Sequence, residues 1–137
     1  MVGCPKLKTL NLNLNIYLTS KTIDTLVKYG STLQLESLSL AYQTYLTDDH
    51  VENIINSIPT LQRLNLSGTS VCGFRVQSKT MRRIYMNDCS KCNEETVENV
   101  LIGCPLMQVV ELYSSPLMNS NSLTRLLDKF PNVKLLY

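Results

Sequence analysis

Two cysteines three positions apart are the residues of this sequence that come closest to a reactive centre. Cys89 and Cys92 form a C-x-x-C motif, and thiolates at this spacing can bind zinc or exchange disulfides. Zinc would need further ligands, for which Cys72 or Cys104 are available, but the sequence has no second C-x-x-C. The motif also lacks the strand leading directly into a helix that is typical of thioredoxin-like proteins. We therefore interpret these thiols as structural and expect no metal and no cofactor.

The single histidine of the chain, His50, follows Asp48 and Asp49. Catalysis needs a nucleophile, a base and stabilising donors in one place, and these three residues occupy a predicted helix start, where capping and first-turn acids explain them. No glycine-rich phosphate loop is present, and no pair of carboxylates shares a predicted face. The sequence therefore predicts that the protein is not an enzyme.

Length and composition indicate one ordinary domain or one short repeat array. The chain has 137 residues, 44% hydrophobic and 18% charged, with a formal net charge of +2. This balance gives no general electrostatic reason to expect nucleic acid, and no apolar run is long enough for a membrane span. The five cysteines are an odd number, and the N-terminus does not resemble a signal peptide. We expect an intracellular protein, cytoplasmic or nuclear.

The pattern L-x-x-L-x-L, with conservative apolar replacements, recurs along the whole chain. Successive copies begin 28, 26, 20, 26 and 26 residues apart. Since residues two apart in a strand point to the same side, the last two apolar positions of each copy predict a short strand with an apolar inner face. The copies are Leu7-Leu10-Leu12, Leu35-Leu38-Leu40, Leu61-Leu64-Leu66, Met81-Ile84-Met86, Met107-Val110-Leu112 and an incomplete sixth, Val133-Leu136.

Four of the copies are followed by a second apolar pattern with helical spacing. Each contains three apolar residues at i, i+3 and i+4, which predicts one helix face and hence a strand–turn–helix unit. The trios are Ile23-Leu26-Val27, Val51-Ile54-Ile55, Val97-Val100-Leu101 and Leu123-Leu126-Leu127. The copy at residues 61–80 is too short for such a helix. We expect an irregular or extended link there, with a local bend or locally exposed core.

These features resemble the cysteine-containing subclass of leucine-rich repeats, familiar from F-box/leucine-rich-repeat proteins and similar to the ribonuclease-inhibitor type. The resemblance rests on the ~26-residue period, on the Gly-Cys-Pro starts at residues 3–5 and 103–105, and on the Leu-Thr-Asp-Asp turn at residues 46–49. It implies an α/β solenoid, or horseshoe, of about five and a half repeats, with a parallel sheet on the concave face and helices on the convex face. In this subclass a Cys or Asn follows the strand and hydrogen-bonds the turn; here that position holds Asn15, Gln43, Thr69, Cys89 and Ser115.

Neither end of the predicted array has a polar cap of the kind that solenoids normally carry. We therefore expect residues 1–137 to form a single leucine-rich-repeat domain that is a segment of a longer array or a subunit covered by neighbours.

The outward-facing strand positions form the candidate binding site. Three columns are predicted on the concave face, and the sixth strand contributes Leu135 to the first and Tyr137 to the second. Large residues with polar groups, which are common in binding hot spots, gather on the later strands. The predicted protein-binding residues are Arg63, Asn65, Arg83, Tyr85, Asn87, Glu111 and Tyr113.

The sequence thus predicts a non-catalytic protein-interaction module, and the family resemblance implies the substrate-recognition part of an F-box-like ubiquitin ligase receptor. One alternative is a structural subunit that docks through its uncapped ends within a larger complex. A second is an RNA-binding surface formed by Arg63, Arg82 and Arg83, which Glu111 and the low net charge oppose.

Overall fold

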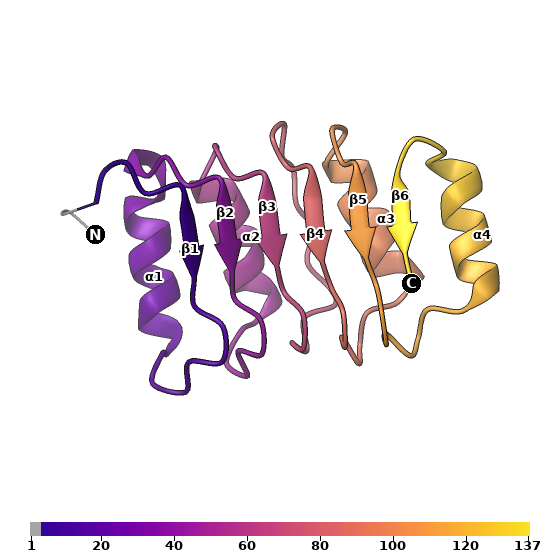
Figure 1. Cartoon of the computed structure of the whole chain (residues 1–137), viewed down its shortest axis with the longest axis horizontal. Coiled ribbons are helices and arrows are strands. Elements are labelled where there is room, and N and C mark those ends of the chain that lie inside the picture. The colour runs from indigo at the N-terminus through magenta and orange to yellow at the C-terminus, as the bar shows by residue number, and fades with distance from the viewer. Residues whose placement is uncertain (1–3) are drawn as a thin grey trace.

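The computed structural model describes residues 4–137 and shows an open α/β fold with one six-stranded parallel sheet. The strands lie side by side in chain order, β1 to β6, and each pairs only with its sequence neighbours (Figure 1). The strands are β1 (Thr9–Asn11), β2 (Ser37–Ser39), β3 (Arg63–Asn65), β4 (Arg83–Tyr85), β5 (Val109–Glu111) and β6 (Lys134–Leu136).

Four helices of ten residues and one short 3-10 turn cover one face of this sheet. α1 packs against α2, and α3 packs against α4, whereas β3 and β4 are joined without a helix. The helices are α1 (Ser20–Tyr29), α2 (Asp48–Ser57), α3 (Glu94–Gly103) and α4 (Ser120–Lys129), and the 3-10 turn is η1 (Gly30–Thr32). None of the helices in the described part of the chain is long and apolar enough to cross a membrane.

Polar residues begin the helices as the sequence predicts. The Thr47 hydroxyl accepts a hydrogen bond from the backbone N–H of His50 at 3.3 Å, and His50 Nδ1 accepts the N–H of Thr47 at 3.2 Å. Asn93 caps α3 through the N–H of Thr96 at 3.0 Å. His50 is therefore half of a capping box, which satisfies two backbone donors that the helix itself leaves unpaired.

The aliphatic repeat forms one continuous core between sheet and helices. The inner positions of β2 to β5 are buried, as are Met81 and Met86, and the predicted helix trios supply the opposite side. Leu7, Leu10 and Leu12 of the first unit are only partly buried because β1 is an edge strand. The fold is of the repeat type: a strand–turn–helix unit recurs along the chain, and only the link from β3 to β4 lacks the helix.

The prediction for the last strand is wrong by one residue. Val133 occupies the expected first apolar position of the sixth copy. Its N–H bonds the carbonyl of Phe130, just as the N–H of Met107 bonds the carbonyl of Cys104 in the fifth copy. However, Val110 pairs with Leu135, which is buried, so Lys134 and Leu136 lie on the outer face in place of Leu135 and Tyr137. The link between this first apolar residue and the strand is one residue shorter here than in the other copies. Because side chains alternate along a strand, that difference moves each side chain of β6 to the opposite face of the sheet.

The expected link without a helix is present between β3 and β4, but the core beside it is not exposed. Residues 69–80, which we call the bridging segment, run in an extended conformation between α2 and α3. Val71, Phe74 and Val76 point inward from this segment and are buried, with Phe74 fully so. These three side chains supply the apolar cover that a helix face supplies elsewhere.

Cysteines at the two predicted Gly-Cys-Pro starts are not in equivalent environments. Cys104 is buried after α3, whereas Cys4 is exposed. Gly3, the first residue of the other start, lies outside the described residues.

Candidate functional site

The side of the sheet not covered by helices, here called the open face, carries the candidate site. In β3 and β4 Arg63 pairs with Arg83, and Asn65 pairs with Tyr85. In β4 and β5 Arg83 pairs with Val109, and Tyr85 pairs with Glu111. Since parallel strands lie about 4.8 Å apart, the register forms two rows of outward side chains across neighbouring strands.

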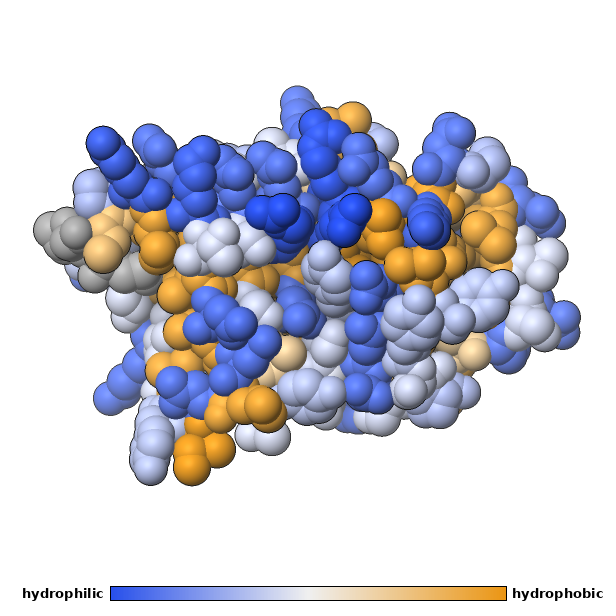
Figure 2. Space-filling model, in the orientation of Figure 1, coloured by the Kyte–Doolittle hydropathy of each residue, from blue (hydrophilic) through white to orange (hydrophobic). Residues whose placement is uncertain are grey.

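The first row holds Arg63, Arg83, Val109 and Lys134, and the second holds Asn65, Tyr85, Glu111 and Leu136. Arg63 and Arg83 are exposed, and Tyr85 is half-buried. Figure 2 shows that the open face is mainly hydrophilic over the middle strands, with apolar surface towards the ends of the sheet.

The side chains of Arg63, Arg83 and Tyr85 make no hydrogen bond or ion pair with any other part of the chain that the structure describes. A binding partner would not have to break intramolecular contacts to reach their donors. Two neighbouring guanidinium groups without a carboxylate partner favour acidic or polar groups on the molecule that contacts them.

Glu111 is held in place by a neighbour. The side-chain amide of Asn87 donates to Glu111 Oε2 at 3.3 Å, and Asn87 Oδ1 accepts the backbone N–H of Tyr113 at 2.9 Å. The backbone N–H of Asn87 in turn bonds Ser67 Oγ at 3.2 Å. Asn87 therefore positions the carboxylate of Glu111 and ties adjacent turns together, while Tyr113 is exposed beside it.

The turns after the strands share one backbone conformation. Residues at the same place in five successive units have φ between 53° and 68°, and they are Leu14, Tyr42, Gly68, Asp88 and Ser114. The Tyr42 ring lies over Gly68, where an added Cβ would come within 2.2 Å of a ring carbon. The Tyr42 hydroxyl donates to Asp88 Oδ2 at 2.8 Å, and this bond to a carboxylate raises the pKa of Tyr42.

In four of the five turns the side chain at the next position bonds a turn carbonyl, whereas Asn15 in the first turn accepts the backbone N–H of Tyr17 at 3.1 Å. Gln43 donates to the carbonyl of Leu12, Thr69 to that of Leu66 and Ser115 to that of Met86. Cys89 also points its thiol at the Leu66 carbonyl, at 3.4 Å. Small or polar residues at this site therefore satisfy buried backbone acceptors, which explains their occurrence without a catalytic role.

The cysteines of the C-x-x-C motif are both buried. Burial raises the pKa of the Cys89 thiol, and it raises that of Cys92 to about 12. Both thiols are therefore protonated near neutral pH, which disfavours nucleophilic chemistry. Within residues 4–137 no group of three or more His, Cys, Asp and Glu side chains is arranged to hold a metal ion.

The structure places all seven predicted residues on or at the rim of the open face, and it places on the same rows two residues that the sequence pattern did not assign there. Lys134 and Leu136 extend the rows beyond Val109 and Glu111 because of the register of β6. Arg82 lies just before β4 and is exposed, outside the two rows. The third predicted column is less accessible at two of its positions, since Ala41 and Ser67 are buried. The column comprises Asn13, Ala41, Ser67, Asn87 and Tyr113.

No family model matches the chain. Among solved structures, it is similar to a chain in the crystal structure of the Rad7 and Elc1 complex in yeast, with 15% identity and a TM-score of 0.72 over 94% of this chain. The chain spans 32% of the length of that match. It is also similar to a tropomodulin C-terminal domain from Caenorhabditis elegans and to Chaetomium Mex67:Mtr2 subunits. The first has 14% identity and a TM-score of 0.53, covering 96% of this chain and 73% of the match. The second has 19% identity and a TM-score of 0.51, covering 93% and 78%. These likenesses show a shared fold.

Proposed function

We propose that this chain is a non-catalytic protein-interaction module that binds a partner protein through the open face of its sheet. The observation that carries the proposal is the register that places Arg63 and Arg83 in one row and Tyr85 and Glu111 in the next. Arginine and tyrosine bury large areas while keeping polar groups, and they dominate measured binding hot spots.

Each residue of the cluster has its own role in this proposal. Arg63 and Arg83 bind carboxylate or other polar groups of the partner, because no internal acceptor satisfies them in the described chain. Tyr85 and Tyr113 pack against apolar groups. Glu111, held by Asn87, discriminates against partners that present a negative group at its position.

We further propose that the fold is a leucine-rich-repeat solenoid of about five and a half repeats, with the open face as its concave wall. The recurring left-handed turn and the strand order support this architecture. The more specific role is substrate recognition in an F-box-like ubiquitin ligase receptor. Two similar solved structures come from protein complexes, Rad7 with Elc1 and Mex67 with Mtr2, which supports a role in binding proteins. The five free cysteines favour an intracellular location.

The test is the double substitution Arg83→Ala with Tyr85→Ala. A partner is first recovered by affinity purification from cells that express the chain, and its affinity is then measured with purified proteins. Loss of two hot-spot side chains predicts about 2–4 kcal/mol weaker binding, roughly 30- to 1000-fold. The melting temperature should change little because Arg83 is exposed and Tyr85 only half-buried.

A matched control removes one tyrosine and one cation elsewhere. Tyr17→Ala with Lys21→Ala changes two exposed residues before and at the start of α1, far along the sheet from β4. This variant should bind normally. Unchanged affinity for the partner in a folded Arg83→Ala/Tyr85→Ala variant would reject the open face as the site. If the same variant instead lost binding to RNA, that result would favour the nucleic-acid alternative.

A second candidate function is a structural subunit that docks through an end of its sheet. It is favoured by exposed apolar side chains on the turn after the edge strand β1. Leu14 is 70% exposed, Ile16 is 85% and Tyr17 is 87%. Apolar side chains gathered in this way mark interaction surfaces. Solution mass by light scattering tests it, since a monomer that stays soluble at high concentration would speak against this role.

A further inference from the structure

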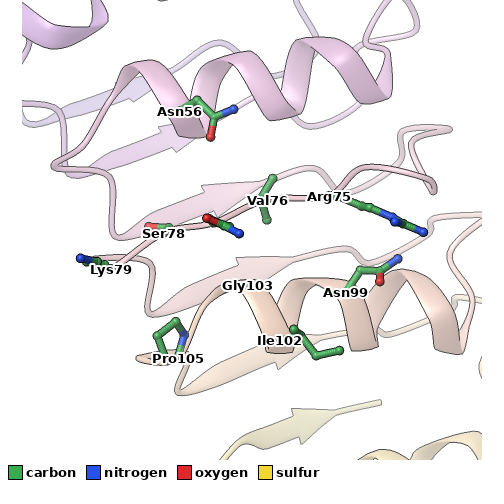
Figure 3. Close-up of a pocket in the computed structure, with 10 residues that line it drawn as sticks. Asn56, Arg75, Val76, Ser78, Lys79, Asn99, Ile102, Gly103 and Pro105 are labelled. Atoms are coloured by element: carbon green, nitrogen blue, oxygen red, sulfur yellow. The ribbon is translucent and has the colours of Figure 1, made fainter.

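A groove of about 810 Å³ lies on the helix side of the molecule, and none of its lining residues belongs to the rows of the open face. It runs between α2 and α3, above the bridging segment, where the helix of the third unit is missing (Figure 3). Elsewhere neighbouring helices pack directly, α1 on α2 and α3 on α4. The groove is therefore a consequence of replacing a helix with an extended chain.

The floor of this groove is fixed by hydrogen bonds from both sides. On the α2 side the Asp48 carboxylate accepts the backbone N–H groups of Cys72 and Gly73 at 2.8 and 3.0 Å, and Glu52 accepts that of Arg75 at 2.6 Å. On the α3 side the N–H of Ser78 bonds the carbonyl of Gly103 at 2.9 Å. A binding surface here is already ordered, which reduces the entropy that a ligand must offset.

The two charged residues that line the groove are both cationic. Arg75 and Lys79 are exposed, and neither belongs to an ion pair in the described structure. The Glu52 carboxylate of α2 accepts the backbone N–H of Arg75 and forms no ion pair with its guanidinium group. In contrast, Arg125 and Lys129 of α4 are neutralised by the α3 carboxylates Glu94 and Glu98.

Uncharged groups around these cations are suited to a peptide backbone. Asn56 of α2 and Asn99 of α3 face the groove from opposite walls, and Gln77 lies between the cations on the floor. Carboxamides both donate and accept, as peptide groups require. No described residue accepts the backbone N–H of Gln77, which lies in this exposed stretch. Ile102, 63% exposed, offers one apolar contact.

We propose that this groove binds an extended, acidic segment of a partner protein. Arg75 and Lys79 lie towards opposite ends of the groove (Figure 3), so an extended ligand along it would meet them with two separate acidic groups. A partner helix inserting an apolar face fits poorly, because Val71, Phe74 and Val76 are already buried in the core and the exposed side chains of the floor are Arg75, Gln77 and Lys79.

The test uses a phage-displayed library of random 12-residue peptides, selected on the full chain. Peptides that also bind the Arg75→Glu/Lys79→Glu variant are removed, and the remaining peptides are synthesised with a fluorophore. Binding is measured by anisotropy. Both residues are exposed and unpaired, so the variant should melt normally. The matched control is Arg63→Glu/Arg83→Glu, which reverses two charges on the open face.

The proposal predicts that groove-dependent peptides carry at least two Asp or Glu residues at separate positions. Their affinity should fall at least 10-fold in the Arg75→Glu/Lys79→Glu variant and by less than 2-fold in the open-face variant. Replacing the two acids with amides should give a similar loss. Failure to recover groove-dependent peptides, or recovery of peptides without acids, would overturn it. So would groove-dependent binding of labelled single-stranded RNA in place of peptides. Because the open-face variant is measured in parallel, either outcome leaves the proposed function separately testable.

Discussion

Phe74→Ala tests most sharply whether the bridging segment replaces a helix in the core. Phe74 is fully buried, and it is the largest side chain that this segment contributes. Truncation of a buried phenylalanine removes apolar contacts and leaves a cavity, at a cost of about 3–5 kcal/mol. For a chain of this length each kcal/mol lowers the melting temperature by about 3–4 °C, so the expected decrease is roughly 9–20 °C.

The chain supplies its own control, since Phe130 is the other phenylalanine and is only partly buried beyond α4. Urea and thermal unfolding of Phe74→Ala and Phe130→Ala are compared by circular dichroism, and hydrogen exchange locates the loss. Protection should fall first in residues 69–80 and at the facing end of α3. A cost below 1 kcal/mol for Phe74→Ala, or one smaller than for Phe130→Ala, would refute the view that this side chain closes the core.

Three further predictions follow from close contacts and shifted pKa values. Gly103→Ala should lower the free energy of unfolding, measured in urea, by about 1–3 kcal/mol or more. The reason is that a Cβ at this position would lie 1.6 Å from the Val76 carbonyl oxygen. A variant as stable as the wild type would contradict this close contact. The hydrogen bond from Arg125 lowers the pKa of Glu94 to about 2, so the pair's stabilisation is fully present above pH 4.5 and is lost as pH falls towards 2. A carbon-13 titration should show this midpoint, and Arg125→Gln should return it towards 4.5; an unchanged midpoint would exclude the pair. In the native protein Cys4 should react rapidly with a thiol reagent at pH 8, whereas Cys92 and Cys104, with pKa values raised by burial to about 12 and 11, should react only on unfolding. Rapid labelling of either buried cysteine would contradict that burial.

The periodic apolar residues were sufficient to predict the sheet and its helices. Each inner position tolerates only an apolar side chain, so Leu38, Leu64, Ile84 and Val110 recur at spacings that a stacked strand requires. The outward partners of these residues follow from alternation alone, which is why the site residues of β3, β4 and β5 were predicted correctly in position. Their role in binding stays a prediction.

The register of β6 could not be read from the sequence because Leu135 and Leu136 are both aliphatic. Either could have been the inner residue, and only packing beside Val110 selects Leu135. The bridging segment was ambiguous for a related reason. Its apolar residues Val71, Phe74 and Val76 are spaced by three and then two positions, which matches neither a strand nor a helix period well enough to predict a buried extended chain. The groove above it was missed because Asn56, Arg75 and Asn99 belong to three separate elements.

Site-specific photo-crosslinking at the open face tests the central claim most directly. A benzoylphenylalanine is placed at Tyr85, in the middle of the second row, or at Tyr17, which is exposed on the turn after β1. After irradiation in cells that express the chain, position 85 should give a discrete protein adduct that Arg83→Ala abolishes, and position 17 should not. An adduct at position 17 with none at position 85 would contradict the claim that the open face binds the partner.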